Sequence, residues 1–492
     1  MEKLSEKLLS LQPQIVFGYF DEICKIPRPS EQEEKIVDYL IDFAKNNSLD
    51  YKKDEAGNIL ISKPAVKGKE RVKTVVLQSH VDMVAEKNDG IPHNFSADPI
   101  IPYVEGDWIQ AQGTTLGADC GIGMAVSLAA LSDKELTHGP IECLFTVNEE
   151  TGLTGAKAMT KDFFSGKILI NLDSEDDGEL FIGCAGGIDT IASLTYNMEP
   201  TPSDYLGFKI SIKELLGGHS GDDINKQRAN AIKLLNRFLW KTAIKYDLKI
   251  SLYEGGDKRN AIPREAFAFF VICDKFEADL YESFSDFKTD IIAEYGAVEQ
   301  KMTIELTRAE LPKYVIDEIT QFEILAAIQA CHSGVISMSS EIDNLVETSN
   351  NLASIKFVNS REIQIATSQR SSIESKKYDA SDTVKSLFSF ANARVSVSDG
   401  YPGWKPNTDS EILQIAQSAY RELFNEEPSV KAVHAGLECG LFLEKYPDLD
   451  MISFGPTIKD VHSPNERLQI STVDKFWKLI KEILAKIPEN EK

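Results

Sequence analysis

Three short apolar segments decide the fold class: RVKTVVLQSH (71–80), IECLFTVNEE (141–150) and KILINLD (167–173). Each is rich in Val, Ile, Leu or Phe, a composition typical of strands that are buried on both faces of a sheet. Between the first two lies GIGMAVSLAALSD (121–133), whose small apolar residues recur at helical spacing. Strand and helix therefore alternate, which predicts an α/β fold with an open sheet.

Two amphipathic helices are predicted on the surface of the same domain. Apolar side chains stand three and four positions apart in residues 33–46 and again near residue 480, which gives each helix one buried face. The expected buried positions are Ile36, Val37, Leu40, Ile41 and Ala44 in the first helix and Phe476, Ile480, Ile483 and Ile487 in the last.

The hydrophobic pattern changes after residue 187. Apolar and polar residues then alternate with period two, which indicates strands of a sheet that is exposed on one side. The alternating stretches are 208–215, 248–256, 266–273, 362–370 and 393–400, with helical patterns at 229–246 and after residue 372; the α/β signature returns with a helix near 408–423 and a strand at 450–456. We therefore predict an α/β domain formed by residues 1–186 and 398–492, and an inserted α+β domain at 187–397.

The composition excludes several classes of protein. The 492 residues include 53 Lys and Arg against 77 Asp and Glu, which gives a formal net charge of −24. Because nucleic acids and anionic membranes are bound by basic surfaces, we expect neither as a partner. The N-terminal residues lack the pattern of a signal peptide, and no apolar stretch is long enough to span a bilayer. The seven cysteines are scattered without CxxC spacing, which fits a reducing cytoplasm.

Titratable side chains gather where the predicted strands end. The first strand ends in His80-Val81-Asp82, and on an extended backbone Asp82 faces the same way as His80 and can orient its ring. Asp119 lies in a glycine-rich loop, GTTLGADCGIG (113–123), directly before a helix. Each residue also has an ordinary explanation, because His-x-Asp spacing is often incidental and Asp is favoured at helix N-caps.

The later strands add more acids and a second histidine. Glu149 and Glu150 stand side by side after the second strand. Asp173 ends the third strand, and His462 follows the last one. Solvated turns would explain each acid alone, but ligands bind at the carboxyl ends of strands in an open α/β sheet, so these side chains are expected to converge. Carboxylates and neutral imidazoles suit Zn²⁺, Mn²⁺ or Co²⁺, and a bridging carboxylate can hold two such ions about 3.5–4 Å apart.

These residues lie in motifs that resemble the aminoacyl-histidine dipeptidases, also called cytosol non-specific dipeptidases, which belong with aminoacylases and carnosinases to the co-catalytic dinuclear zinc peptidases. The motifs run in family order from about residue 17 to 470: HVDMVAEKN, TTLGADCGIGMA, LFTVNEETGLTGA, NLDSEDDGEL, IGCAGG, GGHSGDDI, KRNAIPREA, YPGWKPN, HAGLECG and SFGPTIKDVHSPNERL. The resemblance implies a three-layer αβα catalytic domain at 1–186 and 398–492, an α+β lid and dimerisation domain at 187–397, and a cytoplasmic homodimer.

The resemblance also implies a role for each residue at the strand ends. The implied ligands of two divalent ions per subunit, zinc being expected with manganese or cobalt as alternatives, are His80 and Asp173 on one ion, Glu150 and His462 on the other, and Asp119 bridging both. Glu149 is the implied general base, and Asp82 is the implied partner of His80. Adjacent residues on an extended chain point apart, which suits one glutamate on the metal and the other facing the water.

On the inserted domain the resemblance implies residues that contact the substrate. His219 of GGHSG helps to polarise the scissile carbonyl, often across the dimer, and Asn260 of KRNAIP contacts the substrate. Arg370 of ATSQRSS grips the substrate carboxylate, for which a planar guanidinium is suited. The loop around His434 and Gly436 lines the substrate's C-terminal side. From spacing alone, an incidental histidine in a glycine turn and an exposed strand-end cation remain alternatives for His219 and Arg370.

Two positions depart from the pattern of many relatives. Cys120 follows the bridging aspartate where Asn is common, and Asn148 precedes Glu149 where Asp is common. Neither is an implied ligand, so we expect a tuned metal affinity or pH optimum rather than lost activity. Cys120 beside a metal site also raises the prospect of thiolate coordination or oxidation.

The sequence therefore predicts a metallodipeptidase that hydrolyses Xaa-His dipeptides such as carnosine, with a broad range. In this reading, water between two metal ions attacks the peptide carbonyl while Glu149 takes its proton. Two alternatives stay open: an N-acyl-amino-acid deacylase on the same scaffold, and a catalytically silent metal-binding or dimerisation module.

Overall fold

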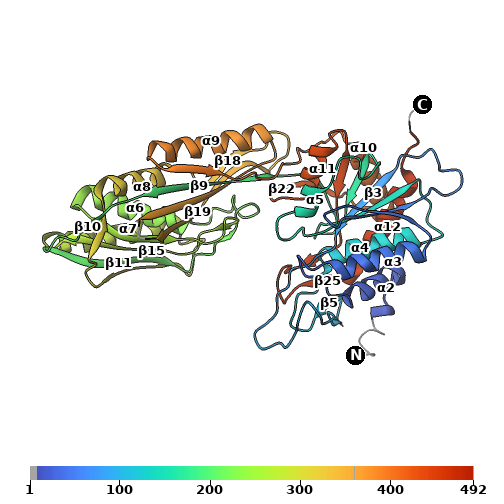
Figure 1. Cartoon of the computed structure of the whole chain (residues 1–492), viewed down its shortest axis with the longest axis horizontal. Coiled ribbons are helices and arrows are strands. Elements are labelled where there is room, and N and C mark those ends of the chain that lie inside the picture. Colours follow the sequence, from blue (N-terminus) through green and yellow to red (C-terminus); the bar gives the residue numbers. More distant parts are fainter. Residues whose placement is uncertain (1–7, 360, 491–492) are drawn as a thin grey trace. The chain divides into compact units, whose positions relative to one another are not determined.

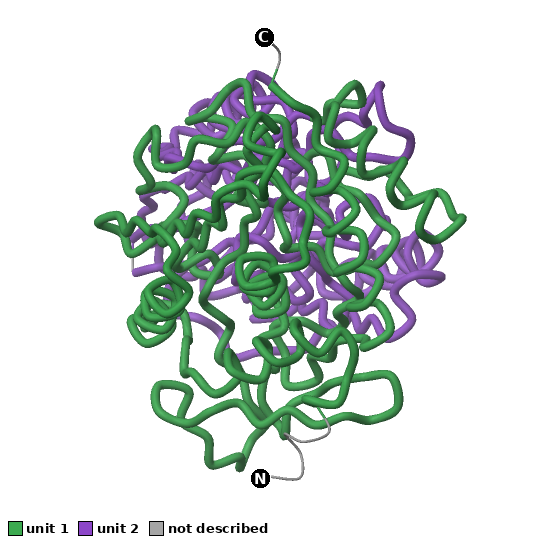
Figure 2. Tube along the Cα trace, turned by 90° about the vertical axis from the view of Figure 1, so that its right-hand side faces the viewer, with its two compact units in different colours: residues 1–183, 406–432, 437–492 green, residues 184–405, 433–436 purple. Residues whose placement is uncertain are grey.

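The structure is a computed structural model that describes residues 8–359 and 361–490. The chain divides into two compact units, which are coloured separately in Figure 2. Unit 1 comprises Met1–Gly183, Pro406–Ala432 and Leu437–Lys492, and unit 2 comprises Cys184–Lys405 and Val433–Gly436. The inserted domain predicted at 187–397 lies within unit 2, which also takes in the following residues up to Lys405 and the separate segment 433–436.

Unit 1 is built on an eight-stranded sheet whose central strands run parallel (Figure 1). Strand β3 (Val75–His80) pairs in parallel with β6 (Ile141–Thr146) and β7 (Ile168–Asn171), and β7 pairs in parallel with β23 (Asp450–Ser453). Every residue of β3, β6 and β7 is buried, as their continuous apolar runs predict. The other strands are β1 (Asp50–Lys53), β2 (Ile59–Lys63), β8 (Glu179–Cys184) and β22 (Ser429–Val433).

Helices cover both faces of this sheet. In Figure 1, α2 (Gln14–Cys24), α3 (Glu34–Asn46) and α4 (Ala118–Ser132) lie on one side, and α5 (Thr154–Ala158), α10 (Glu411–Phe424) and α11 (Cys439–Lys445) lie on the other. The last helix, α12 (Ile470–Lys486), packs against α10. The predicted α/β class, with helices on both faces of a sheet, is confirmed.

The two amphipathic helices bury the predicted faces, except that one expected residue of α3 is replaced by another in the buried set. In α3, Phe43 is buried and Ile41 is only half-buried, whereas the other four expected positions are buried. In α12 the expected positions Phe476, Ile480 and Ile483 are buried, and Ile487 is buried just past the helix end.

At the edge of the large sheet where the parallel strands end, the observed strands are shorter than the predicted ones. Strand β6 ends at Thr146, so Glu149 and Glu150 lie in the turn that follows rather than on an extended strand. Strand β7 ends at Asn171, two residues before Asp173. Unit 1 also contains a small second sheet, and His462 lies between its strands β24 and β25. The order of the strands is β24 (Ile458–Lys459), β25 (Arg467–Gln469), β5 (Trp108–Ala111) and β4 (Pro102–Glu105).

Unit 2 contains a nine-stranded antiparallel sheet. Its strands, in the order of pairing, are β16 (Thr303–Arg308), β11 (Tyr205–Lys213), β15 (Ala266–Cys273), β13 (Lys249–Gly255), β19 (Val346–Asn359), β20 (Glu362–Ser371), β9 (Gly186–Thr195) and β21 (Arg394–Val397), and β18 (Gly334–Met338) pairs with β19. Burial alternates along β9 and along most of β20, as period-two patterning predicts.

Helices α6 (Ala231–Tyr246), α8 (Glu318–Ala330) and α9 (Glu374–Phe390) lie along one side of the strands of unit 2 (Figure 1). The remaining elements are α7 (Glu277–Tyr295), a short 3₁₀ helix (Asp274–Phe276), and two small sheets that pair β10 (Met198–Pro200) with β17 (Tyr314–Ile316) and β12 (Gly218–His219) with β14 (Ala261–Ile262).

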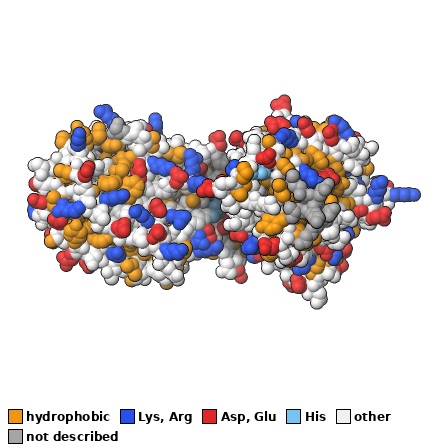
Figure 3. All heavy atoms as spheres, turned by 90° about the horizontal axis from the view of Figure 1, so that it is seen from below, with side chains coloured by type: hydrophobic (Ala, Val, Ile, Leu, Met, Phe, Trp, Pro, Cys, Tyr) orange, Lys and Arg blue, Asp and Glu red, His pale blue; other side chains and the backbone are white. Residues whose placement is uncertain are grey.

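Charged side chains of both signs lie on the surface, and the expectation that nucleic acids and membranes are not partners stays a prediction. On the face shown in Figure 3, basic and acidic side chains are interspersed on both units. Within residues 8–359 and 361–490, no helix combines the length and the apolar character that crossing a bilayer requires.

Candidate metal centre

The five predicted metal ligands come together within unit 1, at the edge of the sheet where the parallel strands end. His80 is the last residue of β3, and Asp173 follows β7. Glu150 lies in the turn after β6, and His462 lies between β24 and β25. Asp119 lies in the first turn of α4, at a kink where its backbone is not helical. Five segments far apart in the sequence therefore contribute to one site.

Asp119 joins two clusters of potential ligand atoms. Its Oδ1 lies 3.2 Å from Nε2 of His80, which in turn lies 3.3 Å from Oδ1 of Asp173. Its Oδ2 lies 3.2 Å from Nε2 of His462, which lies 3.0 Å from Oε2 of Glu150. Each carboxylate oxygen of Asp119 thus lies beside a different histidine, and each of these histidines lies beside a different second acid.

The spacing of these atoms fits two divalent cations. Ligand atoms about 2.0–2.2 Å from a tetrahedral zinc ion lie on the order of 3.3 Å from one another, which is the spacing found in both clusters. The second carboxylate oxygen of Glu150 is buried and has no hydrogen-bond partner among the described residues. A buried acceptor of this kind is costly unless a cation or a donor satisfies it. The residues present therefore fit a dinuclear metal site.

The pKa shifts in the site follow from its shortage of positive charge. Hydrogen bonds to Asp119 and Glu150 raise the pKa of His462 to about 11, against the opposing effect of burial. Burial and the neighbouring Asp119 raise the pKa of Asp173 to about 7, although His80 opposes this rise. Bound divalent ions would supply the missing positive charge and leave both histidines as neutral ligands.

Asp82 organises both His80 and the turn after β6. Its Oδ1 lies 3.4 Å from Nδ1 of His80, so the two side chains face each other as predicted. The same carboxylate accepts hydrogen bonds from the backbone N–H groups of Glu149 (3.0 Å) and Glu150 (3.2 Å) and from the Ser30 hydroxyl (2.8 Å). Although burial opposes it, the contact with His80 lowers the pKa of Asp82 to about 2. Asp82 therefore remains charged and fixes the backbone of the two glutamates.

Glu149 differs from Glu150 in its surroundings. Glu150 contacts His462, whereas burial raises the pKa of Glu149 well above its usual range and the carboxylates of Asp173 and Glu150 add to that rise. The predicted reason for this division is wrong, because the two residues do not lie on an extended chain: β6 has ended, and Asn148 before them has a φ of +54°. The turn, and not strand alternation, separates their side chains.

The ordinary explanations for these residues are wrong. Gly117 precedes α4 at the N-cap position, and Asp119 makes no capping hydrogen bond, because its oxygens face the two histidines. His80 and Asp82 are almost completely buried, which excludes an incidental surface pair.

Cys120, the departure from the family pattern, lies in a group with His80 and Asp173 whose potential ligand atoms are all within 4.8 Å of one another. Its thiol donates to the Leu172 carbonyl at 3.3 Å.

Glu466 is a site residue for which the sequence analysis gave no role. Its buried carboxylate accepts hydrogen bonds from four consecutive backbone N–H groups, those of Leu116, Gly117, Ala118 and Asp119, at 2.7 to 3.3 Å. The buried Arg28 binds the Gly117 carbonyl from the other side, and a Cβ at Gly117 would lie 2.7 Å from that guanidinium. Glu466 and Arg28 thereby fix the loop that presents Asp119.

A row of buried polar side chains lies one residue layer below the ligands. Gln78 and Asn171 each stand two positions before a ligand, His80 and Asp173, and so point to the same side of the sheet. Asn171 donates to Gln78 (2.6 Å), and Gln78 donates to the carboxylate of Glu438 (2.6 Å), which is completely buried. Only the i − 2 spacing from a ligand would have indicated Gln78 and Asn171, and Glu438 lies in the motif HAGLECG without a role having been predicted for it.

The predicted substrate residues lie in unit 2. His219 belongs to β12 and lies 3.3 Å from Asp222, and Asn260 is an exposed residue just before β14. Nε2 of the buried His434 shares a hydrogen bond with the Ser349 hydroxyl at 2.7 Å. These three side chains are thus held on neighbouring segments of one unit, and their contact with a substrate stays a prediction.

Arg370 and Gly436 belong to the same unit. Arg370, in β20, is only 6% exposed, so the alternative of an exposed strand-end cation is wrong. It donates to the Tyr401 hydroxyl at 2.9 Å. Gly436 lies against the same ring, because a Cβ at this position would come within 2.7 Å of it.

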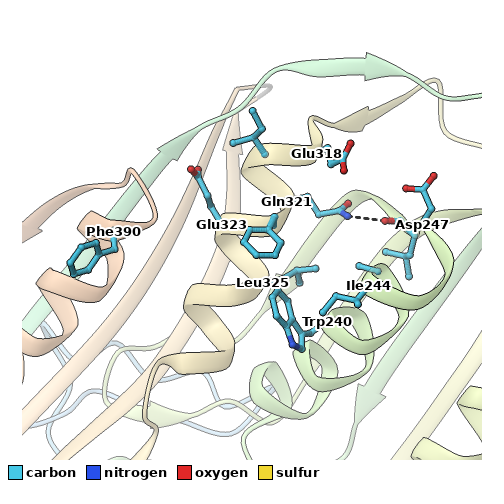
Figure 4. Close-up of a pocket in the computed structure, with 12 residues that line it drawn as sticks. Trp240, Ile244, Asp247, Glu318, Gln321, Glu323, Leu325 and Phe390 are labelled. Carbon is cyan, nitrogen blue, oxygen red and sulfur yellow. Dashed lines mark hydrogen bonds between the residues drawn. The ribbon is translucent and has the colours of Figure 1, made fainter.

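A separate cavity of about 740 Å³ in unit 2 contains none of these residues (Figure 4). It lies between α6 and α8, with Trp240 and Leu325 among its lining side chains and Phe390 at the end of α9. Its acidic lining residues are Asp247, Glu318 and Glu323. The cavity therefore has no part in the predicted chemistry.

Comparison with known proteins assigns the chain to a family. The model of peptidase family M20/M25/M40 matches residues 76–486. The chain is 41% identical over 484 residues to the cytosol non-specific dipeptidase of Escherichia coli (strain K12), a match that covers 98% of this chain and 99% of the relative. This protein belongs to peptidase family M20/M25/M40.

Solved structures agree with that assignment. The aminoacylhistidine dipeptidase from Vibrio alginolyticus is similar over 100% of both chains, with 41% identity and a TM-score of 0.91. A tripeptidase from Staphylococcus aureus shares the fold over 97% of this chain and 99% of its own, with 18% identity and a TM-score of 0.57. The predicted family, fold class and enzyme class, a metal-dependent peptide-bond hydrolase, are confirmed.

Proposed function

We propose that this protein is a dipeptidase that hydrolyses Xaa-His dipeptides such as carnosine, together with a broad range of other dipeptides. Relatives at 41% identity over nearly the whole chain are a non-specific dipeptidase and an aminoacylhistidine dipeptidase. A small dipeptide is therefore the substrate class best supported for this chain.

The observation that carries the metal part of the proposal is the position of Asp119 between two histidine–carboxylate clusters. In this proposal His80 and Asp173 would hold one divalent ion, Glu150 and His462 would hold the other, and Asp119 would be shared by both. Zinc is the expected metal, with manganese and cobalt as alternatives, because nitrogen and carboxylate oxygen ligands suit all three.

The chemistry follows from this arrangement. When bound, two divalent ions lower the pKa of a water molecule and polarise the peptide carbonyl. Glu149 accepts the proton of that water and returns it to the leaving amine. Asp82 fixes the backbone N–H of Glu149 and keeps this base in place.

The proposal assigns substrate recognition to residues of unit 2. His219 donates a hydrogen bond to the carbonyl oxygen as negative charge develops there. Arg370 binds the C-terminal carboxylate of the dipeptide, and Asn260, His434 and Gly436 line the substrate. We further propose a cytoplasmic homodimer, with unit 2 serving as the lid and dimerisation domain.

Replacement of the proposed base tests the mechanism. In Glu149→Ala we expect hydrolysis of Xaa-His dipeptides to fall about 10³-fold, because the proton acceptor is lost, while metal content measured by plasma emission stays near that of the wild type. Turnover that survives the substitution with both ions bound would contradict the assignment of Glu149.

A substrate panel tests the reaction class. The zinc- or manganese-loaded protein should hydrolyse carnosine-like dipeptides faster than N-acetyl amino acids under the same conditions. The reverse preference would favour the deacylase, and a lack of turnover with either substrate would favour a silent metal-binding module.

A further inference from the structure

Tyr401 of the motif YPGWKPN has no role in the function proposed above. Tyr401 packs its ring against two glycines of unit 2. A Cβ at Gly187 would lie 2.6 Å from the ring and the hydroxyl, and a Cβ at Gly436 would lie 2.7 Å from the other side of the ring. Real side chains do not approach so closely, so both positions must be glycine for the ring to fit. The space around Tyr401 is therefore shaped for this side chain.

The backbone of Tyr401 is fixed as firmly as its ring. Its N–H donates to the Gly187 carbonyl at 2.9 Å, and its own carbonyl accepts from the Gly187 N–H at 3.1 Å. The same carbonyl accepts from the ammonium group of Lys377 at 2.7 Å, and Lys377 is only 1% exposed. The position of the hydroxyl at the end of the ring is thus determined by contacts that no substrate has to provide.

The hydroxyl meets a buried cation, Arg370, that has no direct ion-pair partner among the described residues. Nη1 of Arg370 donates to the Tyr401 oxygen at 2.9 Å, which uses a lone pair of that oxygen and leaves its proton free to donate. Nε of Arg370 is buried without a hydrogen-bond partner, and within the described parts of the chain no carboxylate forms an ion pair with this guanidinium. The Asp222 carboxylate is near enough for Arg370 to contribute to the lowering of its pKa, but it forms no ion pair or hydrogen bond with the guanidinium, so the buried Nε still lacks an acceptor that a bound anion could supply.

We propose that Tyr401 is a specificity-determining residue that binds the C-terminal carboxylate of the substrate together with Arg370. Arg370 supplies the charge, and the Tyr401 hydroxyl donates a second hydrogen bond while it holds the guanidinium in a fixed orientation. A carboxylate accepts from both groups, whereas a C-terminal amide presents N–H donors to them and carries no charge. The inference rests on the proposed function, because it requires dipeptides as substrates.

The test compares two substrates in the metal-loaded, full-length protein: a Xaa-His dipeptide and the same dipeptide with a C-terminal amide. We expect the wild type to prefer the free acid. In Tyr401→Phe, KM for the free acid should rise about tenfold with kcat nearly unchanged, because one hydrogen bond to a charged group is lost. Kinetics on the amide should stay near those of the wild type. A merely structural role for Tyr401 would alter both substrates alike.

Tyr253→Phe is the matched control, because its hydroxyl donates to the Ile232 carbonyl at 2.7 Å in the core of unit 2. It should leave the preference for the acid over the amide unchanged. Equal loss on both substrates in Tyr401→Phe, or no change in KM for the acid, would overturn the role of Tyr401. A wild type that hydrolyses acid and amide equally well would overturn carboxylate recognition while leaving the dipeptidase intact. A wild type with no dipeptide turnover would overturn the proposed function itself.

Discussion

The polar clusters of the two units have opposite charge. In unit 1, the carboxylates outnumber the two histidines, and backbone N–H groups and Arg28 hold the surrounding loops from behind. In unit 2, the guanidinium of Arg370 is buried beside the Tyr401 hydroxyl and forms no ion pair with a carboxylate of the described residues. In the proposed function the first cluster binds cations and the second binds the carboxylate of the substrate. Affinity for metal and affinity for that carboxylate should therefore respond to different substitutions.

The largest effect is expected from Asp119→Asn, which removes the charge shared by the two clusters of unit 1. We expect hydrolysis to fall on the order of 10⁴-fold, because neither ion keeps its bridging ligand. Metal content and turnover should fall together. Asp176→Asn is the control, since this acid pairs with Lys459 outside the clusters. Retention of two ions per chain in Asp119→Asn would remove the basis of the comparison.

Glu466→Gln tests whether the loop behind Asp119 sets metal affinity. An amide nitrogen would face backbone N–H groups that now meet a carboxylate oxygen, so the loop should shift. We expect metal affinity, measured by competition with a chelator, to fall about 10- to 100-fold. Glu142→Gln is a matched control, because Glu142 also accepts from two backbone N–H groups, of Ser165 and Gly166. Equal losses in both variants would indicate a general effect on stability.

Glu438 should make the stability of the metal-free protein depend on pH. Burial raises the pKa of Glu438 to about 8 from an ordinary value near 4.5. The folded state therefore keeps this proton at pH values where the unfolded state has lost it, so stability is lost as pH rises from about 4.5 to 8. Glu438→Gln, which stays neutral, should lose on the order of 2 kcal/mol less over this range in denaturant titrations. Identical slopes for both proteins would contradict a buried, protonated Glu438.

The smallest effect is expected in unit 2, from Gly436→Ala. The added methyl group would press on the Tyr401 ring and shift its hydroxyl. KM for a free-acid dipeptide should rise about threefold, less than the loss of a whole hydrogen bond, with metal content unchanged. Gly18→Ala is the control, because a Cβ there meets no atom within 4 Å. A loss of metal in Gly436→Ala would mean that the two clusters are not separable.

Helices and strands that are continuous apolar runs could be predicted from the sequence. A strand whose buried residues are polar could not. Strands β3, β6 and β7 and helix α4 are continuous apolar runs, and each was predicted. Strand β19 was missed, because VETSNNLASIKF (346–357) shows little apolar alternation. Its buried polar residues are paired instead with neighbouring side chains, as in the contact of Asn350 with Gln369 at 2.7 Å.

The same limit applies to the site. Four of the five proposed ligands follow predicted strands, whose ends can be read from the apolar pattern, whereas Asp119 precedes a helix and its role came from the family resemblance. Glu466 and Glu438 could not be found in that way, since a single acid in a sequence does not indicate that it is buried. The partners of Glu466 lie about 350 positions earlier in the chain, at residues 116–119, so no local pattern connects them.

The hydrogen bonds that Glu466 accepts from residues 116–119 join an early segment of the chain to a late one. A nascent chain that has not been synthesised past residue 466 lacks both His462 and the carboxylate that shapes the Asp119 loop. Nearly all of unit 1 that precedes this point can already be folding on the ribosome, but the bridging geometry is incomplete. The proposed metal centre can therefore be complete only after nearly the whole chain has been synthesised.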